Sequence, residues 1–375
     1  MSTSLPGIAA ELERLNGAHR SRRLSLPQGV DFTSNDYLGL ARHPALREAA
    51  IAALDADGFV GAGGSRLLRG HHPAHARLEE YAAQFFGVEK TLFMGSGFIA
   101  NYALFTALCE RHDAVVFDER VHASVKEGIH AAPAARYRAQ HNNLDSFKTM
   151  IHRARDKGAR RVFVAVEAVY SMDGDCAPLK ELDALARSHD AMLVVDEAHA
   201  TGVFGPRGRG LGETLQNENW ITLHTGGKAL GVSGALLCAR GEIIDYLVNR
   251  SRPFIYSTAP PPHLAAALQR SLQLLDEELW RRERVLALAA FARQKLLPHE
   301  LASPGTQIIP IVLGEEKRAL DVAQDLQNAG FDVRAIRPPT VPEGTSRLRI
   351  SIHADHCEDQ ILALASVLRA STASP

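Results

Sequence analysis

The sequence predicts an α/β protein in which a large domain with a mostly parallel β-sheet precedes a small α+β domain. Three observations lead to this prediction. The chain has 375 residues, which is long enough for two domains. Short apolar runs alternate with helical stretches from about residue 90 to 240, and the order of elements changes after about residue 300. We therefore expect an N-terminal segment (1–45), a large domain (46–255), and a linking helix with the small domain (256–375).

The large-domain strands are predicted from apolar runs bounded by polar turns. Several of the runs are rich in Val, Ile and Leu, as the buried strands of a parallel sheet are. Between two of them, residues 178–188 place Leu179, Leu182 and Leu185 at intervals of three, which indicates a helix. Strand, helix and strand in succession predict βαβ units. The expected strands are 114–118, 161–167, 191–196, 220–225 and 235–239.

The C-terminal part begins with a long helical stretch over residues 263–297, which follows three consecutive prolines. After it, the pattern predicts a strand, a helix, two strands and a terminal helix. The expected ranges are strand 308–313, helix 317–328, strand 331–336 and strand 347–352, followed by the C-terminal helix.

Composition and charge exclude several classes of protein. The content of 46% hydrophobic and 23% charged residues is ordinary for a globular protein. A formal net charge of −1 gives no electrostatic reason to expect nucleic acid or a membrane surface as a partner. The N-terminus lacks the apolar stretch of a signal peptide, and no apolar run is long enough to span a bilayer. The four scattered cysteines favour reduced thiols and a cytoplasmic protein.

Polar side chains follow three of the predicted strands, where each strand ends. Glu167 and Ser171 follow the first, Asp196 and His199 the second, and Thr225 and Lys228 the third. In open α/β sheets, ligands bind outside the carboxyl ends of the strands. We therefore expect these side chains to converge on one pocket.

Other motifs with similar letters do not fit their usual function. Residues 196–199 spell DEAH, but the chain has no phosphate-binding loop, because Thr222 and Ala229 stand where that loop needs Gly and Ser or Thr. The histidine groups at 71–75 and 353–356 are interpreted as surface histidines, so no metal site is expected. There is also no GxSxG motif of a serine hydrolase.

Six segments together resemble the α-oxoamine synthases, a family of fold-type-I enzymes that use pyridoxal 5′-phosphate. The resemblance runs from about residue 30 to 370 with the motifs in the same order, although the chain is shorter than the family between Arg20 and Asn35. It implies a fold-type-I pyridoxal-phosphate-dependent transferase whose large domain binds the cofactor. The segments are SNDYLGL (34–40), GAGGSR (61–66), GSGFIAN (95–101), VYSMDGD (169–175), VDEAHATG (195–202) and GKALGVSG (227–234).

The resemblance implies a role for each matching cofactor residue. Lys228 would carry the cofactor as a Schiff base, and Asp196 would keep the pyridine nitrogen protonated so that the ring accepts electrons. His122 would stack on the ring and donate to the reacting carbonyl. His199 and Ser171 would bind the phenolic oxygen. The phosphate would be held by Gly97 and Phe98 at the start of a helix over 98–110, by Thr225, and by Thr258 from a partner subunit.

The family's site is shared between two chains, so the resemblance also implies a homodimer. Arg349 would bind the carboxylate of the amino acid as a bidentate pair, with Asn35 and His122 beside it. Arg337, Thr340 and Arg20 would contact the acyl substrate, an acyl thioester of coenzyme A or of an acyl carrier protein. The segments IRPPTVP (336–342) and SRLR (346–349) are most similar to the branch that joins L-alanine to a pimeloyl thioester. Branches that use other amino acids and acyl groups stay open as alternatives.

Overall fold

The computed structural model describes residues 6–215, 219–296 and 305–373, which pack as two compact units. The large unit contains residues 35–171 and 175–285, and the small unit contains the described part of 1–34 and 286–375 together with 172–174. The predicted domain boundaries at residues 45 and 255 were drawn from sequence patterns and stay a prediction.

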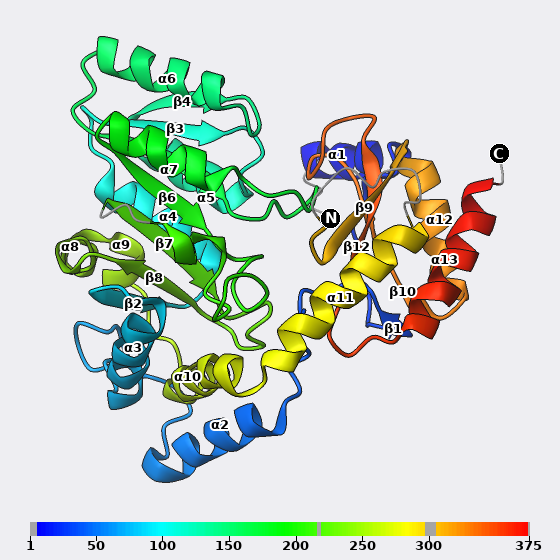
Figure 1. Ribbon diagram of the computed structural model, residues 1–375, viewed down its shortest axis with the longest axis horizontal. Helices are drawn as coiled ribbons and strands as arrows, with labels where there is room; N and C mark the ends of the chain where they lie inside the picture. Colours follow the sequence, from blue (N-terminus) through cyan, green and yellow to red (C-terminus); the bar gives the residue numbers. More distant parts are fainter. Residues whose placement is uncertain (1–5, 216–218, 297–304, 374–375) are drawn as a thin grey trace. The chain divides into compact units, whose positions relative to one another are not determined.

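The large unit is built on a sheet that, within the described residues, has seven strands in the order β2-β8-β7-β6-β5-β3-β4 (Figure 1). Neighbouring strands from β4 to β7 are parallel, whereas β8 pairs antiparallel with both β7 and β2. The predicted mostly parallel sheet is therefore confirmed. The strands are β2 (Lys90–Met94), β3 (Ala114–Asp118), β4 (Ala135–Ala139), β5 (Val162–Glu167), β6 (Ala191–Asp196), β7 (Trp220–Thr225) and β8 (Ala235–Ala239).

Two strands of this sheet, β2 and β4, were not expected from the sequence. Both lie at the edges of the sheet, where one side has no neighbouring strand. The sequence of β4 is ARYRA, and four of its five residues are at least partly exposed, so it lacks the apolar run on which the prediction relied. Edge strands often carry charged side chains, because these discourage pairing with another chain.

Helices cover this sheet and bury its apolar side chains (Figure 1). The helix α4 contacts β7 and β8, while α7 contacts β6. Phe105 on α4 and Leu237 on β8 belong to one apolar core with Phe163, and each of these side chains is 1% exposed or less. The helices of this unit are α2 (Pro44–Asp57), α3 (Pro73–Phe86), α4 (Gly97–Leu108), α5 (Ala123–Ala131), α6 (Leu144–Asp156), α7 (Leu179–Ser188), α8 (Gly241–Arg250), α9 (Arg252–Ile255) and α10 (Pro262–Glu277).

The single helix predicted over 263–297 is wrong at its centre. The structure has two helices, α10 and α11 (Leu279–Leu296), separated at Glu278. Glu278 leaves the helical conformation, with φ −118° and ψ 54°. No proline or glycine marks the break between the two helices, which lies in an acidic stretch at 276–278. The predicted last residue, Leu297, lies outside the described residues.

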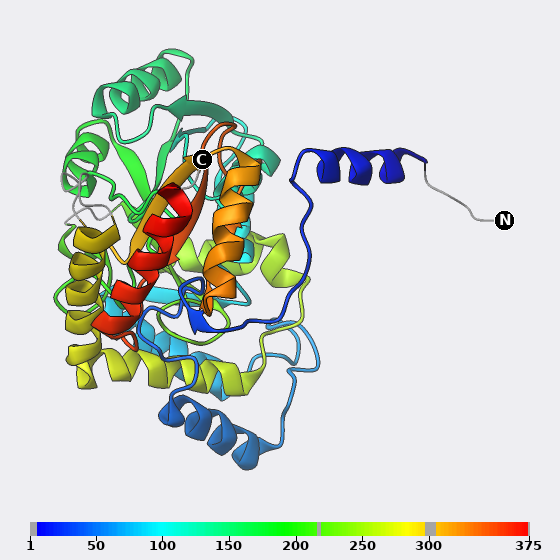
Figure 2. The same cartoon turned by 90° about the vertical axis from the view of Figure 1, so that its right-hand side faces the viewer.

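The small unit has an antiparallel sheet in the order β11-β12-β9, and α12 packs against all three strands. Figure 2 shows α12 and α13 side by side, in agreement with their contacts. An N-terminal helix, α1 (Pro6–Gly17), leads into the unit through an extended segment. The other elements are β9 (Ile308–Gly314), β11 (Ala335–Ile336), β12 (Ser346–Ser351), α12 (Glu316–Asn328) and α13 (Glu358–Ala373).

The strand predicted over 331–336 is also wrong, because these residues form two short strands in different sheets. The first, β10 (Phe331–Asp332), pairs in parallel with β1 (Val30–Asp31). The second, β11, pairs antiparallel with β12. A continuous apolar pattern does not reveal that the chain changes partners between Asp332 and Ala335.

Of the histidines interpreted as surface residues, His71 is exposed, but His75, His353 and His356 are buried, so the interpretation is wrong for these three. His75 is 0% exposed and its Nε2 lies 2.8 Å from the carbonyl oxygen of Pro260. It also joins His72 in capping the start of α3. His356 is 4% exposed and stacks on Phe32 with ring centroids 4.1 Å apart. These rings serve helix capping and packing, which short-range spacing does not reveal.

None of the described helices is both long enough and apolar enough to cross a bilayer.

Candidate active site

Three adjacent strands of the large sheet end in polar residues that face one pocket. Glu167 ends β5, Asp196 ends β6 and Thr225 ends β7, and these strands are neighbours in the sheet. Lys228 and His199 follow two of them and also line the pocket, as the sequence predicted for this edge of the sheet. The lining residues are Gly97, Phe98, Asn101, His122, Ser124, Glu167, Asp196, Ala198, His199, Leu223, Thr225 and Lys228.

Lys228 is the first member of a chain of hydrogen bonds. Its Nζ lies 2.7 Å from Nε2 of His199, and Nδ1 of His199 lies 2.7 Å from the hydroxyl of Tyr37. The Tyr37 hydroxyl in turn donates to Oδ1 of Asn35 at 3.0 Å. An ammonium group at Lys228 would donate to Nε2 of His199, which would then carry its proton on Nδ1. The two contacts hold the His199 ring between Lys228 and Tyr37.

Asp196 is a buried carboxylate held by two donors. Its side chain is 6% exposed, Oδ2 accepts from Nδ2 of Asn101 at 2.7 Å, and Oδ1 accepts from the backbone N–H of Ala198 at 3.0 Å. Sequence reasoning missed Asn101. It lies four residues after Gly97 on α4, so it shares the face of the helix that begins at the pocket, and this spacing could have identified it.

His122 lies at the start of α5, where it caps the helix. Its Nδ1 accepts from the backbone N–H of Ser124 at 3.2 Å and lies 2.8 Å from the hydroxyl of the same residue. Burial lowers the pKa of His122, and the nearby charge of Asp196 opposes this effect. The capping bond uses Nδ1 as an acceptor, so Nε2 is the ring nitrogen that carries a proton when the ring is neutral.

Glu167 is a second buried carboxyl group in the pocket wall, and no role was predicted for it. It is 2% exposed, and burial, followed by the charge of Asp196, raises its pKa to about 8. Its Oε2 accepts from the backbone N–H of Ser171 at 3.1 Å, whereas Oε1 is buried without a hydrogen-bond partner. Glu167 was recognised in the sequence only as a polar residue at a strand end.

The part of the pocket at the start of α4 is suited to an anion. Helix α4 begins at Gly97 and Phe98, so unpaired N–H groups and the positive end of the helix dipole face this side. The hydroxyl of Thr225 donates to the carbonyl oxygen of Gly234 at 3.3 Å and lies beside Gly97. The expected helix start at residue 98 is one residue late, which does not affect this geometry.

These residues fit pyridoxal phosphate on chemical grounds. Burial is the main cause of the raised pKa values of Glu167 and Glu197, and the charge of Asp196 adds to both. A cation beside Asp196 would relieve this excess of negative charge, and a protonated pyridine nitrogen is such a cation. Lys228 offers the amine for the aldehyde, and the start of α4 offers donors for the phosphate.

The remaining predicted residues lie outside this pocket. Ser171 is 7% exposed and is not among the lining residues. Thr258 lines a second cavity of the large unit, with Arg66 and Phe254. Asn35 belongs to the large unit, where it accepts from Tyr37.

Four of the residues expected to bind substrates belong to the small unit, namely Arg20, Arg337, Thr340 and Arg349. Arg349 is 7% exposed and donates to the Ser351 hydroxyl at 3.0 Å. Arg20 donates to Glu316 at 2.7 Å and to Glu343 at 3.0 Å.

Arg337 and Thr340 contact the N-terminal segment of the same unit. Arg337 donates to the backbone oxygens of His19 and Ser21, and Thr340 accepts from Arg22 at 3.1 Å. Burial lowers the pKa of Arg337.

Comparison with known proteins identifies related chains over nearly the whole length. The model of the class I and II aminotransferases matches residues 27–368. The chain is 43% identical to the 8-amino-7-oxononanoate synthase of Chromobacterium violaceum, over 97% of this chain and 98% of that protein. It is also 43% identical to the synthase of the same name from Anaeromyxobacter dehalogenans, over 97% of this chain and 96% of that protein.

Two kinds of solved structure are similar to this one. A serine palmitoyltransferase from S. paucimobilis with bound PLP and myriocin has a TM-score of 0.89 at 28% identity, and the match covers 97% of this chain and 96% of that one. An 8-amino-7-oxononanoate synthase from Francisella tularensis has a TM-score of 0.77 at 28% identity, over 91% of this chain and 96% of that one. With the fold, the pocket and these matches together, the chain belongs to the class I and II aminotransferase family and, within it, to the group of the 8-amino-7-oxononanoate synthases.

Proposed function

We propose that this chain joins L-alanine to a pimeloyl thioester, with loss of carbon dioxide, to form 8-amino-7-oxononanoate, a step of biotin biosynthesis. The observation that carries the proposal is the identity of 43% over nearly the full length to synthases of this name. The chain uses pyridoxal phosphate as its cofactor. Related structures contain it, and the Lys228 pocket has the groups that it needs.

Lys228, Asp196 and His122 have distinct roles in this proposal. Lys228 would hold the cofactor through its amine and, when that amine is free, would accept the proton from Cα of the amino acid. Asp196 would keep a proton on the pyridine nitrogen. His122 would face the ring and donate from Nε2 to the carbonyl oxygen of the acyl donor. The bound cofactor supplies the electron sink that stabilises negative charge on Cα.

The substrate-binding residues extend the proposal beyond the pocket. Arg349 binds the carboxylate of alanine through its planar guanidinium group, and Asn35 contributes a hydrogen bond. Arg337, Thr340 and Arg20 bind the acyl donor, carried on coenzyme A or on an acyl carrier protein. In support, Arg337 and Thr340 lie in the segment that most resembles this branch of the family, and both contact the N-terminal segment, as Arg20 does through Glu316 and Glu343.

Serine palmitoyltransferase activity is the second candidate, because several similar solved structures are enzymes of that name. Their identity to this chain is 28%, the same as that of the solved Francisella tularensis synthase, so identity to solved structures does not favour one activity. Identity to the curated synthases is higher, at 40–43%. Since a pocket that must discriminate side chains depends on sequence more than on fold, we favour alanine and the pimeloyl donor.

A homodimer with a shared site is part of the proposal. In the single chain, Phe98 is 47% exposed at the wall of the pocket, and Leu68 and Tyr256 are 82% and 73% exposed. Large apolar side chains at the surface favour contact with another chain. Thr258, two residues after Tyr256, would then reach the phosphate of the partner's cofactor. Sedimentation of the holoenzyme tests the dimer, and a monomer at assay concentration would contradict it.

We also propose a cytoplasmic location. It is supported by four free cysteines, of which Cys109 and Cys238 are buried, with pKa values that burial raises.

A product assay tests the function. The holoenzyme is given alanine, glycine or serine with pimeloyl, acetyl, succinyl or palmitoyl thioesters, each on coenzyme A and on acyl carrier protein. The proposal predicts the highest kcat/KM for alanine with the pimeloyl donor. A clear preference for serine with the palmitoyl donor would support the second candidate instead. Because one methyl group contributes only about 1–3 kcal/mol of discrimination, slow use of glycine is expected.

A further inference from the structure

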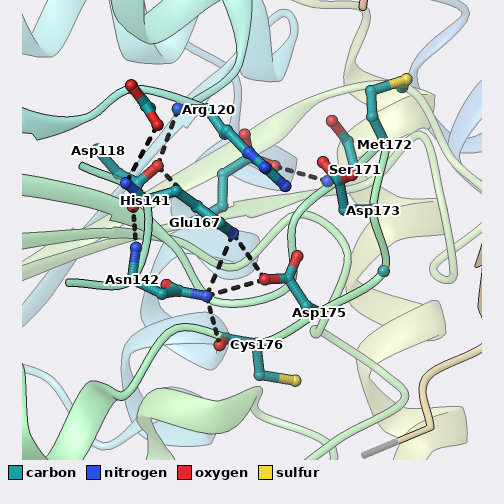
Figure 3. Close-up of polar contacts among 12 residues, drawn as sticks. Asp118, Arg120, His141, Asn142, Glu167, Ser171, Met172, Asp173, Asp175 and Cys176 are labelled. Carbon is teal, nitrogen blue, oxygen red and sulfur yellow. Dashed lines mark hydrogen bonds and ion pairs between the residues drawn. The ribbon is translucent and has the colours of Figure 1, made fainter. Parts of the chain in front are cut away.

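His141 lies between two carboxylates at the same edge of the large sheet, outside the pocket (Figure 3). Its Nδ1 is 2.9 Å from Oδ1 of Asp118, at the end of β3, and its Nε2 is 2.7 Å from Oδ2 of Asp175. The His141 side chain is 13% exposed and that of Asp118 is 0% exposed. A carboxylate at each ring nitrogen requires a proton on both, so the ring is an imidazolium.

The groups around this ring favour its charged form. Burial opposes the charge, but the hydrogen bonds that His141 donates to Asp118 and Asp175 outweigh it and raise the pKa of His141 to about 9. Glu119 adds a carboxylate that lies 3.4 Å from the His141 backbone nitrogen, and Lys126 on α5 interacts electrostatically with Asp118 and Glu119. The rings of His141 and Tyr170 also form a T-shaped pair, with centroids 4.5 Å apart. Two carboxylates against one imidazolium make a partly buried cluster that depends on the His141 charge.

Asp175 belongs to a tight loop over residues 169–176 that the cluster holds in place. The ends of the loop are joined by a bridge between Val169 and Cys176 and by the bond from Tyr170 N–H to the Asp175 carbonyl oxygen at 2.9 Å. Asn142, next to His141, donates from Nδ2 to Asp175 Oδ2 at 2.9 Å and to the Cys176 carbonyl oxygen at 3.1 Å. Residues 141–142 therefore hold the C-terminal end of the loop through hydrogen bonds to Asp175 and Cys176.

The starting arm of the same loop leads directly from the pocket. Glu167, whose carboxyl group lines the pocket, lies two residues before Val169, and its Oε2 accepts from the backbone N–H of Ser171 in the loop. A loop that shifted would move this donor away from a buried carboxyl group. Figure 3 shows the contact between Ser171 and Glu167 and the contacts that Asp175 makes with His141 and Asn142.

The tip of the loop, residues 172–174, packs within the small unit. Arg347 on β12 donates to Oδ1 of Asp173 at 2.7 Å and to the carbonyl oxygen of Met172 at 3.2 Å. Thr306 donates to the carbonyl oxygen of Gly174 at 2.7 Å. The two ends of the loop therefore belong to the large unit, whereas its tip is held by these contacts within the small unit.

We propose that His141 is a positioning residue for the reaction: by joining Asp118 to Asp175 it fixes the loop 169–176, and through Ser171 it sets the place of Glu167 in the wall of the cofactor pocket. The proposal rests on the function proposed above only in that the pocket holds pyridoxal phosphate. His141 touches neither cofactor nor substrate in this role.

The test uses the holoenzymes of wild type, His141→Gln and Asp175→Asn, with His112→Gln as the control. Gln removes the charge and carries its donors on a single nitrogen instead of two. Asp175→Asn keeps His141 and nearly the same side-chain shape but removes one negative charge. His112 is an exposed histidine of the same unit, near the start of β3. Two quantities are measured: hydrogen exchange of the 169–176 amides, and the rate at which pyridoxal phosphate leaves the protein on dialysis.

Both cluster variants are expected to exchange these amides at least about tenfold faster and to lose the cofactor about tenfold faster, because breaking a buried charge pair leaves its partner uncompensated. In wild type, protection of the loop should fall as pH rises through about 9, and in His141→Gln it should be low at every pH. Wild-type exchange and cofactor retention in both cluster variants would overturn the proposal. If His141→Gln does not fold, Asp175→Asn decides alone. Neither measurement needs a substrate, so a wild-type enzyme that keeps its cofactor but does not use alanine and the pimeloyl donor would refute only the proposed function.

Discussion

Replacing Asp196 by Asn tests whether this buried carboxylate is the partner of the cofactor's ring nitrogen. The amide is nearly the same size, but it has one acceptor oxygen where the carboxylate has two. In the structure, Asn101 and the Ala198 N–H each donate to one carboxylate oxygen, so one of them must face the new NH2 group. The substitution therefore removes both a charge and an acceptor at a site that is 6% exposed.

The contacts of Asp196 set the expected loss of stability and the expected loss of turnover. Facing two donors toward one another costs about 1–3 kcal/mol of stability, and relief of repulsion with Glu167 and Glu197 offsets part of it. For catalysis, close charge pairs have coupling energies of about 1.5–7 kcal/mol. A loss of about 4 kcal/mol corresponds to roughly a thousandfold lower turnover, at about 1.36 kcal/mol for each factor of ten.

The assay measures kcat with alanine and the pimeloyl donor, and unfolding in urea, for wild type and Asp196→Asn. Asp183→Asn is the matched control, because Asp183 is 4% exposed on α7 and pairs with Arg187 at 3.2 Å, outside the pocket. The control should lose stability but keep its turnover per folded molecule. Turnover of Asp196→Asn within tenfold of wild type would refute the assignment of Asp196.

Three further predictions use other residues. Lys228→Ala should lose covalent attachment of the cofactor, and a borohydride-reduced adduct found by mass spectrometry on another lysine would contradict this assignment. Arg349→Ala should raise the KM for alanine by about tenfold or more with little change for the acyl donor, and Arg337→Ala should do the reverse; equal effects on both substrates would contradict the separation of roles. His141 has a folded pKa of about 9 against 6.5, so its contribution of about 3 kcal/mol is complete below pH 6.5 and is lost as pH rises through 9. The free energy of unfolding in urea, measured from pH 6 to 10, should therefore fall in wild type but not in His141→Gln. Parallel pH curves for the two proteins would refute this contribution of His141.

The sequence predicted the central strands of the sheet well because each is buried on both faces. Such strands need a continuous run of apolar side chains, and that requirement is visible in one dimension. The edge strand β4 does not have it, since its arginines face solvent, and it was missed. The helices α10 and α11 were merged because neither proline nor glycine stands at the break, where Glu278 leaves the helical conformation.

The pocket that we propose for the cofactor was predicted from motifs and from the ends of strands, and this part of the prediction depended little on long-range contacts. Asp196, Thr225 and Lys228 follow their strands directly, so the sheet alone brings them together. Asn101 was missed because its partner is Asp196, 95 residues further along the chain. Glu167 was seen, but its raised pKa arises from burial and from the charge of Asp196, neither of which a residue type reveals.

By itself, the sequence determined the fold class, the cofactor and the residues that stand at the strand ends, because each of these depends on patterns within a short stretch. Only the tertiary structure decided which polar groups share a hydrogen bond. His141 and Asp175 are 34 residues apart, and Asp118 lies 23 residues before His141. Their charges and proton positions depend on distances of about 3 Å and on exclusion of water, and both arise only when the strands and the loop have packed.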